Sequence, residues 1–265
     1  MENEKKNKSP LRYPGGKTRA CKKLESILNE YFDINKFTNI ISPFFGGGSF
    51  EFHLQNKYNL DIVANDKFTP LYNFWSICKM DNESLCEKLI QKLEFINKEE
   101  FTKLRENIIE EENKLNQSIM YFIINRCSFS GATLSGGFSL EASKKRFTKS
   151  SIDRIRKMDL TNFIIYNFDF EEFINENQDN THLIFLDPPY YLEKTSRLYG
   201  KNGDMHSTFE HDRLYKCLST KKNWLMTYNN CEYIKKLYKD YKIIETGWSY
   251  GMNKSKKSSE IVIIG

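Results

Sequence analysis

The sequence predicts an α/β fold built on a parallel sheet, with a largely helical region inserted into it. An apolar run over 37–41 leads through a glycine turn into helix formers, and a second apolar run follows over 60–66, which is the order of a βαβ unit. Neither glycine nor proline occurs between Leu71 and Ser130, where apolar residues recur at helical spacing. Beyond residue 162, strand-like and helix-like segments alternate to the end of the chain.

Each later element is predicted from its own pattern. Apolar runs rich in Ile, Phe and Leu predict strands, and amphipathic runs predict helices. The expected strands are 162–167, 183–186, 224–228, 241–245 and 260–264, and the expected helices are 212–218 and 231–238. The resulting domain prediction is a disordered tail over 1–9, a sheet domain over 10–70 and 158–265, and a helical domain over 71–157 with a basic loop.

The composition excludes several classes of protein. The six cysteines form no C-x-x-C pair and have no closely spaced histidine partners, so we expect neither a metal site nor a disulfide framework. Residues 1–9 are polar and lysine-rich, unlike a signal peptide, and no stretch approaches 18 uncharged apolar residues. We therefore expect a cytoplasmic protein without a membrane partner. The net charge of +5 permits a polyanionic partner.

The first candidate site is the glycine turn Gly46-Gly47-Gly48, at the end of the first predicted strand. Glycine lets the backbone approach a ligand closely, and ligands of open α/β sheets lie beyond the carboxyl ends of the strands. Asp66 ends the next strand and is placed to bind the ribose hydroxyls of a nucleoside. The turn lacks the G-x-G-x-x-G dinucleotide fingerprint, and Leu11 stands where a P-loop preceding Gly16-Lys17 needs glycine.

The second candidate site is Asp187-Pro188-Pro189-Tyr190, which directly follows a predicted buried strand. Proline cannot continue the strand, so the Asp187 carboxylate and the Pro188 carbonyl are held at the sheet edge. Two such acceptors would suit an exocyclic amine such as adenine N6, whose lone pair is delocalised into the ring. The ring of Tyr190 could stack on a base taken out of the helix.

Four motifs in this order resemble the Dam-like (D12 class, α group) family of adenine-N6-specific DNA methyltransferases. They are Arg12–Lys17, Ser42–Ser49, Ala64-Asn65-Asp66 and Asp187–Tyr190, and the resemblance extends over residues 10–265. It implies a Rossmann-like sheet that binds S-adenosylmethionine, releases S-adenosylhomocysteine and needs no metal. It also implies that the helical domain recognises the DNA target.

The resemblance implies a role for each matching residue. Tyr13, Lys17, Phe44, Gly46, Gly48, Asp66 and Asp187 would bind the cofactor, with Lys17 near its carboxylate. Asp187, Pro188, Pro189 and Tyr190 would form the catalytic motif. Two departures stand out: Ser42 occupies a position where relatives often carry an acid, and the 132–139 stretch differs from the Dam hairpin that reads GATC.

Double-stranded DNA is the predicted partner, and a cognate restriction endonuclease is a second candidate. Base contacts are expected from Asn125, Arg126 and Ser128 in the recognition loop. Phosphate contacts are expected from two basic clusters: Lys144, Lys145, Arg146 and Lys149, and then Lys254, Lys256 and Lys257. Two alternatives stay open at this point, namely a cytosine-N4 methyltransferase and a catalytically idle DNA-binding component of a restriction system.

Overall fold

The computed structural model describes residues 7–13, 15–177, 179, 181–191, 209–247 and 259–265, and it confirms the α/β class. Its described strands form a seven-stranded sheet in the order β3-β2-β1-β4-β5-β7-β6. These strands are β1 (Asn39–Ser42), β2 (Asp61–Asn65), β3 (Phe163–Tyr166), β4 (His182–Leu186), β5 (Trp224–Asn229), β6 (Lys242–Thr246) and β7 (Glu260–Ile264). The pairs among β1 to β5 are parallel, and β7 is antiparallel to both of its neighbours.

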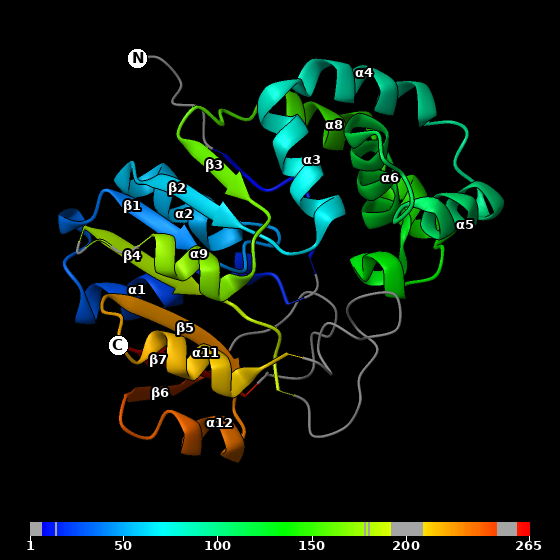
Figure 1. Cartoon of the computed structure of the whole chain (residues 1–265). Coiled ribbons are helices and arrows are strands. Elements are labelled where there is room, and N and C mark those ends of the chain that lie inside the picture. The colour runs from blue at the N-terminus through cyan, green and yellow to red at the C-terminus, as the bar shows by residue number, and fades with distance from the viewer. Residues whose placement is uncertain (1–6, 14, 178, 180, 192–208, 248–258) are drawn as a thin grey trace.

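Helices cover both faces of the sheet (Figure 1). One face carries α1 (Cys21–Tyr31) and α2 (Ser49–Tyr58), and the other carries α9 (Phe170–Glu176), α11 (His211–Leu218) and α12 (Glu232–Leu237). Successive strand side chains point to opposite faces, so Leu183 and Phe185 of β4 join the first core while Ile184 and Leu186 join the second. This double burial explains the continuous apolar runs in the sequence.

The sheet order creates a switch point between β1 and β4. From β1 the chain adds β2 and β3 on one side, and it later adds β4 and β5 on the other. Connections therefore leave these two adjacent strands in opposite directions, which opens a crevice at their carboxyl ends. The glycine turn follows β1 and Asp187 follows β4, so the fold brings both predicted sites to this crevice.

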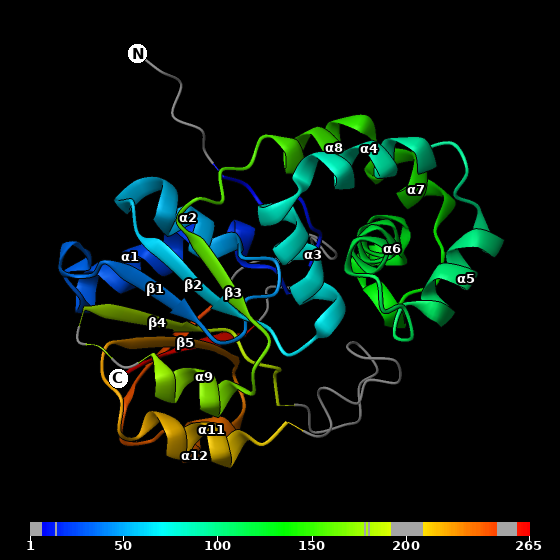
Figure 2. The ribbon, with the colours of Figure 1, turned by 45° about the horizontal axis from the view of Figure 1, so that its top comes forward.

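A group of helices extends beyond the β3 edge of the sheet (Figure 2). Its members are α3 (Thr69–Met80), α4 (Asn82–Lys92), α5 (Lys98–Asn107), α6 (Lys114–Cys127), α7 (Leu140–Arg146) and α8 (Lys149–Arg156). Helix α6 lies in the middle and packs against α3, α4, α5 and α7, and every residue from Gln117 to Asn125 is buried. A helix that is covered on all sides has no exposed polar stripe.

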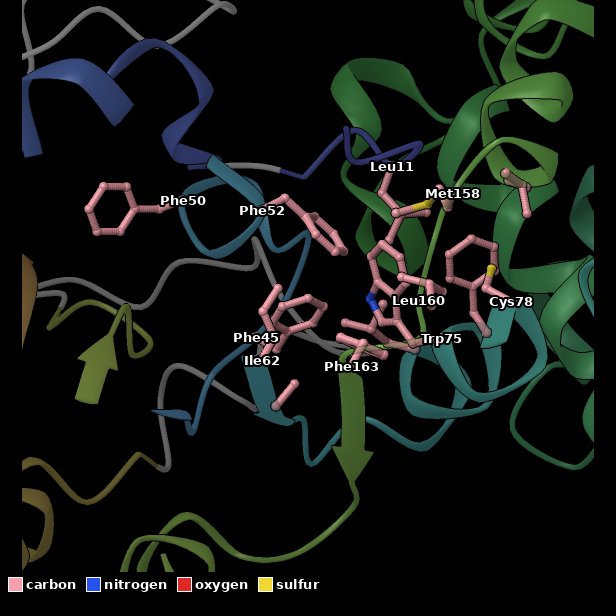
Figure 3. Close-up of a cluster of buried hydrophobic side chains, with 14 of the residues drawn as sticks. Leu11, Phe45, Phe50, Phe52, Ile62, Trp75, Cys78, Met158, Leu160 and Phe163 are labelled. Atoms are coloured by element: carbon pink, nitrogen blue, oxygen red, sulfur yellow. The ribbon is translucent and has the colours of Figure 1, made fainter. Parts of the chain in front are cut away.

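Helix α3 connects this helical group to the sheet. Trp75 is fully buried against Phe45, Phe52 and Phe163, and its Nε1 donates a 3.0 Å hydrogen bond to the Gly46 carbonyl (Figure 3). The neighbouring Phe74 stacks on Phe122 of α6 with ring centroids 5.7 Å apart. The predicted boundary at residue 71 therefore falls inside a helix that contributes to both regions.

Two sequence-based expectations were wrong in detail. Asn7 belongs to the predicted tail, yet it is buried. It forms hydrogen bonds with Gln55, Asn56 and Asp159, which hold the chain against α2 and against the segment before β3. The predicted basic loop contains the short helices η3 (Phe129–Gly131) and η4 (Thr133–Ser135), and its basic side chains lie on α7 and α8. Helix α7 has a side-chain N-cap, Ser139, and helix α8 has another, Thr148. Neither cap was predicted from the sequence.

Within the described ranges, no helix is long and apolar enough to cross a membrane. The six cysteines are all free thiols. No group of His, Cys, Asp or Glu side chains in this same part of the chain converges as a metal site would require. Two further short helices, η1 (Lys17–Arg19) and η2 (Ile34–Lys36), flank α1.

Candidate active site

The glycine turn after β1 depends on backbone conformations that favour glycine. Gly46 and Gly48 have φ angles of +51° and +63°. A Cβ atom on Gly48 would lie 2.3 Å from the Phe45 ring, and one on Gly46 would lie 3.1 Å from the ring of Tyr13. The turn is therefore packed between two aromatic rings. A side chain at Gly48 has no room, and one at Gly46 would require the Tyr13 ring to shift.

Asp66 lies directly behind this turn. It is 8% exposed, and its carboxylate accepts hydrogen bonds from the backbone amides of Gly46 at 2.9 Å and Phe68 at 3.0 Å. Burial raises the pKa of Asp66 to about 6, against the opposing effect of these two amides. The same carboxylate thus supports the glycine turn and lies at the sheet edge where the sequence predicted it.

Asp187 is held in the crevice by two side chains from distant parts of the sequence. The Lys17 ammonium lies 2.7 Å from both carboxylate oxygens, and the Thr227 hydroxyl donates to Oδ1 at 2.6 Å. Lys17 is almost fully buried, whereas Asp187 retains 24% side-chain exposure. A carboxylate offers about four acceptor positions. Among the described residues, these contacts leave an acceptor position on Oδ2 for an incoming donor.

The structure shows two partners of Lys17 within the protein. Its ammonium pairs with Asp187 and donates to the Gly15 carbonyl at 3.0 Å, and the contact with a cofactor carboxylate stays a prediction. The ammonium also lies 5.2 Å from the centre of the Tyr190 ring. Lys17 therefore joins the aspartate and the tyrosine of the catalytic motif, 170 or more residues away in sequence.

The rest of the catalytic motif lines the exit from β4. Pro188 is buried and Pro189 is half-buried. The Tyr190 hydroxyl donates to the buried Glu260 at 2.7 Å, and its ring lies 5.8 Å from that of Tyr228. These contacts anchor Tyr190 to β7 and β5, so its ring has a defined place beside Asp187.

A buried acid that no sequence motif indicated lies behind the site. Glu51 of α2 is 2% exposed and accepts a 2.6 Å hydrogen bond from Ser42. Burial raises the pKa of Glu51 to about 7, and the negative Asp187 adds to this effect. The Glu51 carboxyl group thus occupies the space behind Ser42, and only the fold shows that the two residues meet.

Replacing Glu51 with glutamine is expected to stabilise the protein above pH 7. In the folded protein the Glu51 pKa is about 7, against 4.5 for an ordinary glutamate, so stability falls as the pH rises between these values. The full effect is on the order of 3 kcal/mol. Urea unfolding should show a more stable Glu51→Gln variant at pH 8 and little difference at pH 4.5. The exposed control Glu87→Gln should not change the stability at pH 8. A gain in stability from this control, or equal gains from Glu51→Gln at both pH values, would contradict the raised pKa of Glu51.

A second overlooked group of residues follows β3. The Asn167 side chain donates to the Asp66 carbonyl at 2.8 Å, and the Phe168 amide donates to Asn65 at 2.8 Å. Phe170 then packs against Phe44 of the glycine turn, with ring centroids 5.7 Å apart. The signal in the sequence was a cluster of polar and aromatic residues directly after a predicted strand, as at the two sites that were recognised.

The residues predicted to read bases lie in the interior. Asn125 and Ser128 are both 0% exposed. Asn125 bonds the main chain of Arg12, and the Ser128 hydroxyl accepts a hydrogen bond from the Thr133 amide at 3.2 Å. Arg126 is half-buried and bonds the carbonyls of Arg146 and Pro10. The expectation of base contacts was therefore wrong for Asn125 and Ser128 in this conformation, because their polar atoms face the protein.

Arginines gather where the N-terminal segment meets the helical group. Burial and the neighbouring charges of Arg154, Arg146 and Arg12 lower the pKa of Arg126 to about 10. The pKa of Arg12 is also lowered, first by burial and then by the positive charge of Arg146. In the part of the chain that the structure describes, the Nη1 atom of Arg146 is buried without a hydrogen-bond partner. A group of arginines that act on one another in this way favours an anionic ligand.

The predicted phosphate contacts have different surroundings. Lys144, Lys145 and Lys149 are exposed on α7 and α8, and Lys145 pairs with Glu141 at 2.9 Å. Lys254, Lys256 and Lys257 lie outside the described residues. The first cluster adjoins the arginines through Arg146, so positive charge continues from the helical group toward the N-terminal segment.

The sheet order, the antiparallel β7 and the site at the β1–β4 switch point define a Rossmann-like α/β methyltransferase. The comparison with family models then identifies the kind of methyltransferase. The model for D12 class N6 adenine-specific DNA methyltransferases matches residues 13–252, and the chain belongs to this family.

Two curated relatives agree with this assignment. The chain is 26% identical over 259 residues to the type II methyltransferase M.MjaIII of Methanocaldococcus jannaschii, and the alignment covers 88% of each protein. It is 23% identical over 253 residues to the type II methyltransferase M.CviBI of Paramecium bursaria Chlorella virus NC1A, covering 87% of this chain and 86% of that protein. Both matches extend across the sheet and the helical group.

Proposed function

We propose that this enzyme transfers a methyl group from S-adenosylmethionine to N6 of an adenine that has been flipped out of double-stranded DNA. The observation that carries the proposal is the held Asp187 carboxylate, with an acceptor position left on Oδ2, at the switch point beside the glycine turn. A cytosine-N4 methyltransferase would also act on an exocyclic amine, but the aspartate and the family assignment favour adenine.

The residues at the crevice fit the proposed cofactor. Asp66 is a buried acid at the end of β2, suited to the ribose hydroxyls, and its carboxylate also fixes the adjoining glycine turn through the Gly46 amide. Phe44, supported by Phe170, offers an apolar surface beside this turn. When bound, S-adenosylmethionine supplies an electrophilic methyl group on a sulfonium. Tyr13 packs on the same turn and would border the methionine end.

The chain's own groups then align and polarise the amine. Asp187 Oδ2 and the Pro188 carbonyl accept hydrogen bonds from the two N–H groups of the amine, which leaves the nitrogen lone pair free to attack the methyl carbon. Lys17 and Thr227 keep the carboxylate from rotating. Tyr190 stacks on the base, which returns roughly 1–3 kcal/mol of the cost of unstacking it. A general base is unnecessary because the proton can leave after the methyl group is transferred.

The helical group would hold the duplex against the crevice. Phe129 is 69% exposed on η3, in the segment that the sequence analysis assigned to recognition. We expect this exposed aromatic ring to enter the duplex and fill the gap that the flipped base leaves. The arginine cluster adjoins the same segment through Arg12 and Arg126 and would contact phosphates.

Removing Lys144, Lys145 and Arg146 together is expected to weaken DNA binding and flatten its salt dependence. Each lost phosphate contact lowers the slope of log K against log salt by about 0.9, so we expect a reduction of roughly 2 to 3. Fluorescence anisotropy over a salt series measures it. The matched control removes Lys36, Lys239 and Lys242. These lysines are exposed near the amino ends of β1 and β6, on the side of the sheet away from the crevice. An unaltered slope in the Lys144, Lys145 and Arg146 variant would show that these residues do not contact the DNA.

The test of the whole proposal is to express the protein in a host without DNA methylation. We expect N6-methyladenine in hydrolysed DNA, at one short target that long-read sequencing identifies. N4-methylcytosine instead would establish the alternative amine, and unmodified DNA with retained DNA binding would indicate an idle component. Since both relatives are named type II methyltransferases, we propose a cytoplasmic, DNA-associated enzyme with a cognate restriction endonuclease.

A further inference from the structure

The N-terminal segment 10–17 is held between the helical group and the active site. It starts beside α6 and ends at Lys17, whose ammonium contacts Asp187. Its described residues before η1, 10–13 and 15–16, form no regular strand or helix, so their position depends on contacts from their neighbours. The two sets of contacts come from different regions of the fold.

Asn125 makes the central contact on the helical side. Its Oδ1 accepts a hydrogen bond from the Arg12 amide at 3.0 Å, and its Nδ2 donates to the Arg12 carbonyl at 2.8 Å. One side chain thus satisfies both main-chain groups of Arg12, as a neighbouring strand would. The second Nδ2 hydrogen faces Thr133 Oγ1 at 3.3 Å, and the whole side chain is buried.

Two neighbours of Asn125 enclose the same stretch. Arg126 Nη1 donates to the Pro10 carbonyl at 3.3 Å. Gly131 has a φ of +75°, and a Cβ atom there would lie 2.7 Å from the Arg12 carbonyl oxygen. The end of α6 and the following η3 therefore fit closely around Arg12.

The other end of the segment belongs to the active site. Tyr13 packs against Gly46 and Gly47, and its carbonyl accepts a 3.0 Å hydrogen bond from the Gly16 amide. That turn delivers Lys17 to the Asp187 carboxylate. Few residues separate Arg12 from Lys17, so a shift at the first is transmitted to the second.

We infer that Asn125 is a positioning residue for the active site: by pairing with the main chain of Arg12, it sets the position of Tyr13 and Lys17. The helical group thereby has a direct mechanical link to the Asp187 carboxylate. The inference depends on the proposed function only for the statement that Tyr13 and Lys17 serve the cofactor and Asp187.

The test compares Asn125→Ala with Gln117→Ala in the full-length protein without cofactor or DNA. Gln117 is a matched control because it is a buried amide on the same helix, bonded to the carbonyls of Ile108 and Glu111 and to Asn73. We expect both variants to lower Tm. Amide hydrogen exchange over residues 11–18, measured by mass spectrometry, should become at least tenfold faster in Asn125→Ala alone.

The outcomes separate the inference from the proposed function. Unchanged exchange over 11–18 in Asn125→Ala, or equal acceleration in Gln117→Ala, would overturn the positioning role. If exchange accelerates as expected, calorimetric affinity for S-adenosylhomocysteine should also fall about tenfold. Faster exchange with unchanged affinity would support the positioning role and refute the cofactor role of Tyr13 and Lys17.

A milder variant keeps the test valid if Asn125→Ala does not fold. Asn125→Asp retains the acceptor for the Arg12 amide but loses the donor to the Arg12 carbonyl. Exchange over 11–18 should then rise by an intermediate factor of about three to five. Exchange identical to that of the unmodified protein would overturn the inference.

Discussion

Replacing Asp187 with asparagine is expected to lower kcat for methyl transfer about a thousandfold while leaving much of the DNA affinity intact. The carboxylate is the fixed negative acceptor at the switch point, and removing one such preorganised group commonly costs two to three orders of magnitude. The loss should appear mainly in kcat, because the group acts on the amine as charge develops. Single-turnover methylation of a duplex carrying the mapped target measures it.

This variant also leaves the nearly buried Lys17 without its charged partner. Breaking such a pair destabilises proteins by up to about 3–5 kcal/mol, and less here because Asp187 is partly exposed. The double variant Lys17→Met with Asp187→Asn removes both charges and should recover most of the stability without recovering turnover. Recovery of methylation together with stability would mean that Asp187 matters for folding and not for the reaction.

Replacing Asp66 with alanine is expected to weaken cofactor binding by about thirtyfold. Hydrogen bonds to a charged group contribute roughly 1.5–3 kcal/mol each, and a loss of about 2 kcal/mol corresponds to this factor. Calorimetric titration with S-adenosylhomocysteine, without DNA, isolates the effect from catalysis. Asp81→Ala is the matched control, because Asp81 also accepts a backbone amide but lies at the start of α4.

The pH dependence of the same titration gives a second, independent readout. Because the Asp66 pKa is raised to about 6, the residue is largely neutral at pH 5 and ionised at pH 7.5. Only the ionised form accepts two hydroxyl donors while still supporting the backbone amides. Affinity should therefore increase with pH through this range in the unmodified protein and change little in Asp66→Ala. Equal affinity of the two proteins at pH 7.5 would exclude the ribose contact.

Much of the fold was predictable because the decisive patterns are local. The apolar runs that became β1, β2 and β4 are short and end in glycine, polar or proline residues, so both their type and their limits follow from neighbouring residues. Parallel strands then bring their carboxyl ends to one edge. For that reason Gly46, Asp66 and Asp187 could be placed near one another before any contact was known.

The helical group was less predictable, and Asn125 shows why. Helix α6 is covered on nearly every side, so its apolar residues define no stripe from which the direction of Asn125 could be inferred. The asparagine looked like an available polar group within a recognition motif. The packing of α6 against the N-terminal segment turned it inward, toward a main chain 113 residues away.

Local sequence patterns were enough to predict the α/β class, the order of the strands along the chain and the two motifs that meet at the sheet edge. Periodicity and turn chemistry act over a few residues, so they are legible without coordinates. The tertiary structure alone decided that Lys17 would hold Asp187, that Glu51 would stand behind Ser42, and that Asn125 would fasten the N-terminal segment. Such pairings depend on which side chains the packed core brings together. Residue spacing along the chain does not predict these long-range contacts.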